Sequence, residues 1–150
     1  MRVLAAFIIA ASLGLTAAAH AEDSASRFGA RSRDEFRASL SAHPYDPAGT
    51  RASKIIAGAQ KVTRCMAHAD VRSLMGEPNF GNSTHRSGDP SGKSAGAAWT
   101  YILSAVRGAN DPYDHMITVW LDEHGRVKSV HPRGIDSVPP LRANDQQKCI

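Results

Sequence analysis

No segment of this chain combines a run of Lys or Arg with interleaved aromatic residues, and aromatic residues are few overall. The pattern expected of a nucleic-acid-binding surface is therefore lacking, and we predict no nucleic-acid partner. The net charge of +4 is a mild excess that would favour an anionic surface or an acidic partner, although ordinary solubilising charge is the simpler interpretation. The 150 residues suffice for one domain but not for two ordinary domains.

Long apolar runs are also lacking, except at the start of the chain. Arg2 is followed by an apolar run, Val3 to Leu15, and then by the small-x-small pattern of Ala19 to Ala21. This order predicts a signal peptide over residues 1–21, cleaved after Ala21, because the run is too short to span a bilayer. An N-terminal anchor helix is the alternative. No cysteine stands at the cleavage site to carry a lipid, so we expect a periplasmic or secreted protein with at most peripheral membrane association.

Only two cysteines are present, Cys65 and Cys149. An even pair in an exported protein predicts a disulfide, although two free thiols are the alternative. In the chain-entropy model a loop of this span would stabilise the fold by about 4–5 kcal/mol. The bond would also tie the polar C-terminal tail, residues 132–150, back to the domain.

Helical patterns dominate the first half of the chain. Residues 22–50 are predicted to form a flexible leader containing a short helix over 33–42, with Phe36 on its apolar face. Apolar residues at helical spacing then predict a helix from Thr50, as N-cap, to about residue 62. A second helix is predicted over residues 67–75, ended by Gly76.

Alternating patterns follow in the second half. They predict strands over residues 97–103, 115–121 and 126–131, with the last two joined by a tight turn in which Gly125 takes a positive φ angle. The polar stretch from Asn79 to Gly96 is predicted to be a surface loop. Helices followed by antiparallel strands predict an α+β fold, with two N-terminal helices packed on a three-stranded antiparallel sheet in a two-layer sandwich. The predicted domain spans residues 51–131.

The segment "GDPSGKS", residues 88–94, resembles the end of a phosphate-binding loop. The required first glycine would fall at position 87, which is Ser87. A strand is predicted after the segment, where a phosphate loop needs a helix N-terminus. We therefore interpret the segment as a turn and predict no nucleotide binding.

Candidates for other chemistry are weak. His115, His124 and His131 lie near the last hairpin but offer no third converging ligand for a metal ion. Cys65 and His68 could form a dyad at a helix start, but a structural disulfide is the preferred use of that thiol. The bare Gly-x-Ser-x-Gly pattern occurs at residues 92–96, but a strand is predicted after it where a nucleophile elbow needs a helix, so we predict no strained elbow. We predict no enzyme activity, no metal and no cofactor.

Three short segments together resemble a known family: "CMAHADVRSLMGEPNF", "WTYIL" and "ITVWLDEHGRV". They are similar to the SmpA/OmlA (BamE-like) family of envelope proteins, over roughly residues 51–131. The chain differs by lacking the lipidation cysteine and by carrying Cys65 where the family usually has glycine. The matching positions are Met66, Val71, Leu74, Gly76, Pro78, Trp99, Tyr101, Asp122, Gly125 and Val127.

The resemblance implies a non-enzymatic binding module with a fold like that of β-lactamase-inhibitor protein. It implies a protein partner in the cell envelope, with the β-barrel assembly machinery as one candidate. A small periplasmic inhibitor or immunity-type protein acting on an exported enzyme is the alternative. The aromatic residues Trp99, Tyr101, Trp120 and Phe80 are predicted to contact the partner, together with the loop from Asn79 to Gly96.

Overall fold

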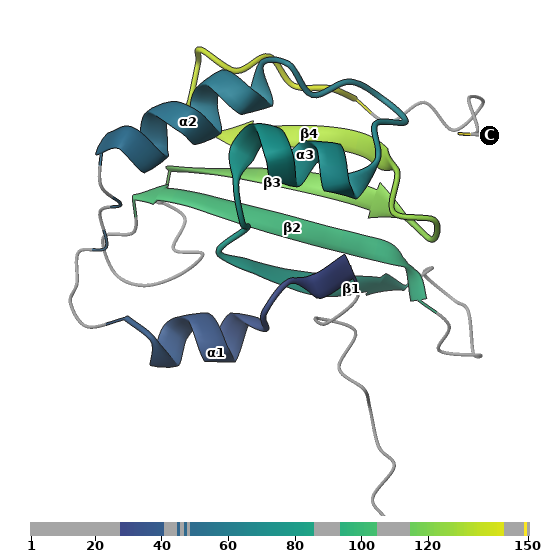
Figure 1. The fold of residues 1–150 in the computed structure, drawn as a ribbon, viewed down its shortest axis with the longest axis horizontal. Helices are drawn as coiled ribbons and strands as arrows, with labels where there is room; N and C mark the ends of the chain where they lie inside the picture. Colours follow the sequence, from purple (N-terminus) through teal and green to yellow (C-terminus); the bar gives the residue numbers. More distant parts are fainter. Residues whose placement is uncertain are drawn as a thin grey trace, which may run out of the picture.

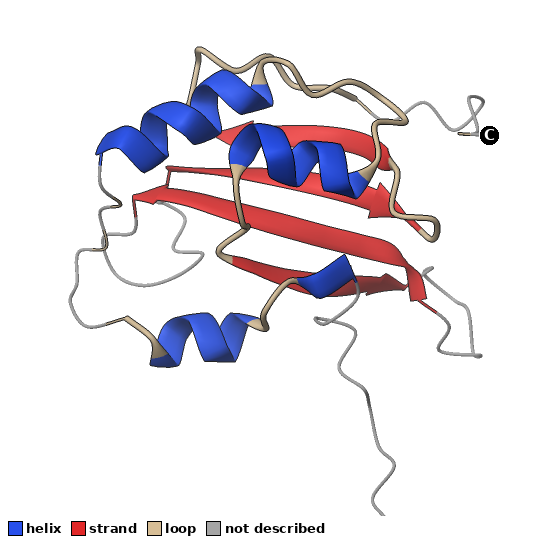
Figure 2. Cartoon of the chain, in the orientation of Figure 1, coloured by secondary structure: helices blue, strands red, loops and turns tan. Residues whose placement is uncertain are grey.

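The computed structural model describes residues 28–40, 45, 47, 49–85, 94–104, 115–142 and 149, so the predicted signal peptide lies outside the described residues. The elements follow in the order α1 (Arg33–Ala38), α2 (Gly49–Ala59), α3 (His68–Met75), β1 (Phe80–His85), β2 (Ser94–Ser104), β3 (His115–Asp122) and β4 (Val127–Arg133). The helices α2 and α3 lie over one face of the sheet, and α1 lies apart from them, below β1 in Figure 1. The predicted α+β class is confirmed (Figure 2).

The sheet is an antiparallel meander of four strands in the order β1-β2-β3-β4, so the predicted number of three strands is wrong. The strand that sequence patterns missed is β1, which occupies part of the predicted loop from Asn79 to Gly96 and pairs with the first half of β2. Its sequence, FGNSTH, is mostly polar because β1 lies at the edge of the sheet, where one side of the strand has no neighbouring strand. The remainder of the predicted loop, residues 86–93, lies outside the described residues.

The main core lies between the sheet and the pair α2 and α3. Trp99 and Tyr101 of β2 are fully buried in it, together with Val119 of β3. Ile55 of α2 and Val71 of α3 are the buried residues that the helices contribute to this core. The prediction that Trp99 and Tyr101 contact a partner at the surface is therefore wrong, because the face that carries these two rings is the face that the helices cover.

A second, smaller core lies on the other face of the sheet. Phe36 of α1 packs there against Phe80 and Ile102, with Leu40 and Tyr45 beside them. The predicted surface role of Phe80 is wrong for this reason, since its side chain is fully buried. The leader is also not uniformly flexible, because burial of Phe36 fixes a short helix within it.

A capping box starts α1. The Ser32 side chain accepts a hydrogen bond from the backbone of Glu35, and the Glu35 carboxylate accepts one from the backbone of Ser32 at 2.6 Å. Hydrogen bonds from the Ser32 backbone and side chain lower the pKa of Glu35. The carboxylate is therefore held in its charged form at the N-terminus of the helix, where negative charge is favourable.

The two longer helices differ from prediction only at their ends. Thr50 lies inside α2 and not at its N-cap, because the helix already includes Gly49. Gly76 ends α3 with a φ of 83°, as predicted. Gly58 allows α2 to approach α3, since a Cβ there would lie 2.5 Å from the carbonyl oxygen of Leu74.

The β3–β4 hairpin has the predicted turn. Gly125 has a φ of 75°, and the Asp122 carboxylate accepts hydrogen bonds of 2.9 Å from the backbone of His124 and of Arg126. Gly125 also lets the ring of Phe28 approach the turn, because a Cβ would lie 2.8 Å from that ring. The turn therefore connects β3 to β4 and also provides a close contact for Phe28, the first described residue.

The C-terminal tail packs on the domain more closely than its polar composition indicated. Pro132 and Arg133 belong to β4, and Val138 is buried in the main core. Leu141 forms an isolated β-bridge with Val130, through backbone hydrogen bonds of 2.8 and 3.0 Å. The predicted disulfide joins Cys149 to Cys65, which lies in the connection between α2 and α3. Cys149, which follows Leu141 in the sequence, is therefore also bonded to the domain.

Candidate binding face

Among the described residues, only α1 and its neighbours cover the sheet face opposite α2 and α3, and α1 packs at the β1 end of that face. Away from α1, alternation along the strands places five side chains together on it. We call this surface the open face: Ala98, Thr118, Trp120, Ser129 and His131. Trp120 pairs with Ala98 of β2 and with Ser129 of β4, so both its neighbours in register are small.

Trp120 is the predicted contact residue that the structure places at the surface. Its side chain is 39% exposed, and it is the one large hydrophobic residue that is exposed within the described part of the chain. The His131 ring lies edge-on at 6.4 Å between centroids, and its Nε2 lies 3.1 Å from the Ser129 hydroxyl. This hydrogen bond fixes the imidazole beside the indole, so the open face presents an aromatic surface with polar groups at its border.

A second cluster joins the start of the described chain to α3. Arg72 stacks over the Trp99 ring at 5.0 Å, donates a hydrogen bond of 2.7 Å to the carbonyl of Phe28 and pairs with Glu77 at 3.0 Å. The His68 ring packs between Phe28 and Trp99, at 4.8 and 5.9 Å. The Trp99 indole N–H is buried and has no hydrogen-bond partner among the described residues. These contacts fix residue 28 to the domain, and they leave no surface for a partner at Trp99.

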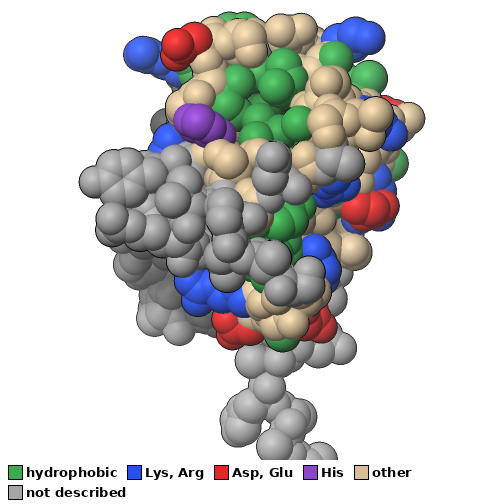
Figure 3. Space-filling view, turned by 90° about the vertical axis from the view of Figure 1, so that its left-hand side faces the viewer, with side chains coloured by type: hydrophobic (Ala, Val, Ile, Leu, Met, Phe, Trp, Pro, Cys, Tyr) green, Lys and Arg blue, Asp and Glu red, His purple; other side chains and the backbone are tan. Residues whose placement is uncertain are grey.

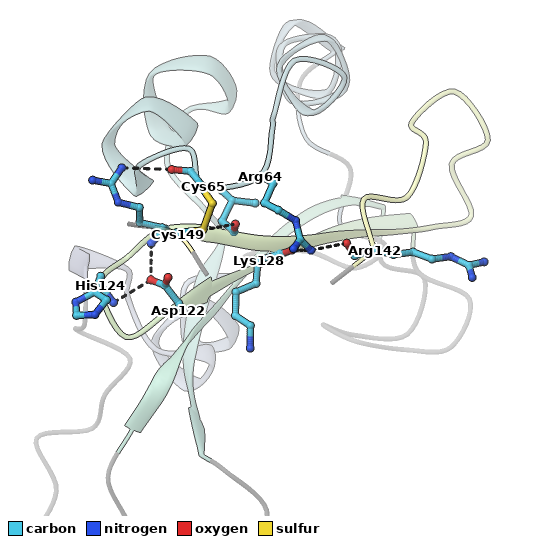
Figure 4. Close-up of a disulfide and its surroundings, with 9 residues drawn as sticks. Arg64, Cys65, Asp122, His124, Lys128, Arg142 and Cys149 are labelled. Carbon is cyan, nitrogen blue, oxygen red and sulfur yellow. Dashed lines mark hydrogen bonds between the residues drawn. A yellow bond between two sulfur atoms is a disulfide. The ribbon is translucent and has the colours of Figure 1, made fainter. Parts of the chain in front are cut away.

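The disulfide lies beside a group of basic residues (Figure 4). Arg64 donates hydrogen bonds to the carbonyl oxygens of Lys128 and Arg142, at 3.2 and 2.8 Å, and so joins the α2–α3 connection to β4 and to the tail. Figure 4 shows the Lys128 side chain on the opposite side of β4 from the disulfide, and the Arg142 side chain extending outward. Lys128 directly precedes Ser129, so it borders the open face.

A third surface lies at the end of the molecule where α2 begins. Figure 3 shows hydrophobic side chains gathered there, with charged side chains of both signs around them. Several hydrophobic residues that pack against the main core remain partly exposed, including Ile56 and Ile135. This is the expected open end of a two-layer domain, and the mixed charges around it favour no particular class of partner.

The predicted chemical candidates are separated in the structure. His115 lies 3.0 Å from the Ser104 hydroxyl at one end of the sheet, and His124 lies in the hairpin turn, 3.7 Å from Glu123. Across the described ranges, no group of three or more His, Cys, Asp or Glu residues could hold a metal ion. The sulfur of Cys65 is bonded to Cys149, so the Cys65–His68 dyad has no free thiol.

Two further features bear on function. Ser94, the last residue of "GDPSGKS", begins β2, so a strand follows that segment, as predicted. In the part of the chain that the structure describes, none of the helices combines the length and the hydrophobicity needed to cross a membrane.

Comparison with known proteins gives no match: no family model, no curated protein and no solved structure is significantly similar to this chain.

Proposed function

We propose that this protein is an exported, non-enzymatic binding module of the bacterial cell envelope, similar to SmpA/OmlA outer-membrane assembly accessory proteins. The observation that carries the proposal is the exposed Trp120 on a sheet face that α2 and α3 leave uncovered. Tryptophan is enriched among the residues that dominate protein–protein binding energy. A partner that covered the Trp120 ring would bury apolar surface without any change in the fold.

Two features support the remainder of the proposal. The disulfide between Cys65 and Cys149 fits an oxidising compartment, as expected for a protein exported after cleavage at Ala21. The helices α2 and α3 followed by an antiparallel meander, with the hairpin turn at Asp122 to Gly125, support the resemblance, which implies three strands where the sheet has four. Lack of a lipidation cysteine makes it a non-lipidated variant of that family.

The proposal is tested by photo-crosslinking in the bacterium that produces the protein. The photoreactive residue p-benzoylphenylalanine replaces Trp120 in one variant and Lys54, an exposed residue of α2, in a matched control. We expect a discrete crosslinked protein from the variant at position 120 and none from the control. Recovery of β-barrel assembly subunits would support the accessory role, and recovery of a single exported enzyme would favour the inhibitor alternative. Equal crosslinking at both positions, or none at position 120, would contradict the proposed binding face.

A further inference from the structure

Residues 28–38, which we call the N-terminal arm, pack against both faces of the sheet at its β1 edge. The centroid of the Phe28 ring lies 4.8 Å from that of the His68 ring, on the face that α2 and α3 cover. The centroid of the Phe36 ring lies 5.7 Å from that of the Phe80 ring, on the opposite face, where Figure 1 shows α1 apart from the other helices. The arm therefore passes around the edge of the sheet and contributes one aromatic ring to each side.

Backbone carbonyl groups of the arm accept hydrogen bonds from donors of the domain. The Arg31 carbonyl accepts a bond of 2.9 Å from the backbone amide of Gly81, and the Arg31 side chain donates one of 2.7 Å to the Asn79 carbonyl. Arg72 of α3 donates a hydrogen bond of 2.7 Å to the Phe28 carbonyl. The domain thus binds the arm as a peptide-binding site binds an extended ligand, through main-chain groups and aromatic side chains.

Two glycines make room for the first of these contacts. A Cβ at Gly125 would lie 2.8 Å from the Phe28 ring, and a Cβ at Gly29 would lie 3.2 Å from Nη2 of Arg72. Phe28 itself has a φ of 63°, which is rare for a bulky residue. Docking of the arm therefore keeps the backbone of Phe28 in an unfavourable conformation, and release of the arm would relax it.

The arm depends on the domain more than the domain depends on the arm. The six residues of α1 are too few for a stable isolated helix. The main core consists mainly of residues from α2, α3 and the strands, and Ala30 is the residue that the arm buries in it. Opening of the arm as one unit would consequently leave the packing of α2 and α3 on the sheet in place.

We propose that the N-terminal arm is an exchangeable internal ligand, and that its site also accepts the same arm from a second copy of this chain. The choice of occupant follows from the fit, because an identical chain supplies the same rings and carbonyl groups in the same order. Exchange of an identical segment between two copies forms a dimer without any new kind of contact. The site does not include Trp120, so the proposal is independent of the proposed function.

The first test supplies the arm as an acetylated, dye-labelled peptide of residues 28–40. The receiving protein is the full chain with Phe28→Ala and Phe36→Ala, which weaken the docking of its own arm, and circular dichroism checks that it is folded. By fluorescence anisotropy, we expect the peptide to bind this double variant about tenfold more tightly than it binds the wild type, whose site is occupied. Peptides with either phenylalanine replaced by alanine are the matched controls and should bind about tenfold more weakly. No binding to the folded double variant, or equal binding to both proteins, would overturn the proposal.

Hydrogen exchange of the wild-type protein, followed by NMR, tests the separate opening of the arm without any variant. The Gly81 amide donates to the Arg31 carbonyl, so it should exchange together with the amide of Phe36, which donates to the Ser32 carbonyl in the arm. The Asn82 amide is the matched control, because alternation along β1 directs it toward β2. We expect Gly81 and Phe36 to exchange at a common rate, about 100-fold faster than Asn82. Equal rates for Gly81 and Asn82 would contradict an arm that opens by itself.

The second copy is tested by measurement of mass. The protein is kept at high concentration in urea below the unfolding midpoint, to release the arm, and is then returned to buffer. Light scattering should show a dimer for the wild type and a monomer for the double variant. A monomeric wild type would refute the second copy as occupant, and a dimer that forms equally in the double variant would refute exchange of the arm. Photo-crosslinking at position 120 is unaffected by either result, so the proposed function stands or fails separately.

Discussion

Loss of the disulfide should lower the stability of this domain by several kcal/mol. The bond joins residues separated by 84 positions. In the chain-entropy model such a loop removes about 15 cal/mol/K from the unfolded chain, which is about 4.6 kcal/mol at 25 °C. Cys65 has a positive φ of 62°, and relaxation of this backbone after loss of the bond would recover about 1 kcal/mol. We therefore expect the double variant Cys65→Ser, Cys149→Ser to lose about 3–4 kcal/mol of unfolding free energy.

Urea unfolding, followed by far-UV circular dichroism, measures this loss, and a thermal scan should show a fall in Tm of roughly 10–20 °C. Wild-type protein in excess reductant is the matched control, because it should unfold at the same urea concentration as the double variant. A loss below about 1 kcal/mol in the double variant would refute the reasoning. It would mean that strain in the folded state, or residual structure in the unfolded chain, offsets most of the loop entropy.

Three further predictions follow from single side chains. Gly96→Ala should destabilise the domain by roughly 2 kcal/mol or more in urea unfolding, because a Cβ at residue 96 would collide with the Leu121 carbonyl oxygen and because the φ of Gly96 is 146°. A near-neutral result would contradict the close approach of β2 and β3 at this residue. Burial raises the pKa of Tyr101 above its usual range, so stability should fall as the pH rises above about 10, and Tyr101→Phe should flatten that fall. Trp120→Ala should lower the unfolding free energy by about 1 kcal/mol or less, whereas Trp99→Ala should cost about 3–5 kcal/mol; similar losses would show that Trp120 belongs to the core.

The strands that sequence patterns predicted are those with a strong alternation. Trp99 and Tyr101 alternate with Thr100 and Ile102, and this period of two predicts a strand whatever covers its faces. The pattern alone does not say which face the helices cover, and the rings of β2 were expected at the surface for that reason. The larger apolar set on β2 and β3 is the buried one, and comparison of the two faces residue by residue would have shown this.

Two elements were harder to predict because their stability comes from distant contacts. The strand β1 has a polar sequence, and its pairing with β2 depends on a register that no local pattern specifies. The six residues of α1 are too few for a stable isolated helix, so α1 depends on burial of Phe36 against Phe80 and Ile102. A polar edge strand and a short docked helix are both set by tertiary packing. For α1 the local signs were the apolar spacing that predicted a helix over residues 33–42, and the capping box of Ser32 and Glu35.

The two faces of the sheet therefore differ in the elements that pack against them. The helices α2 and α3 pack on one face over buried aromatic side chains. The disulfide of Cys149 is made with Cys65, in the α2–α3 connection on that side. On the other face, α1 packs against β1 and β2, whereas Trp120 on β3 has small neighbours on both adjacent strands. Stability of the domain thus depends little on the indole of Trp120, because the main core forms without it. Side chains on the open face can consequently serve a partner without weakening the fold, and that separation is the physical reason for placing function on this face and not on the buried rings of β2.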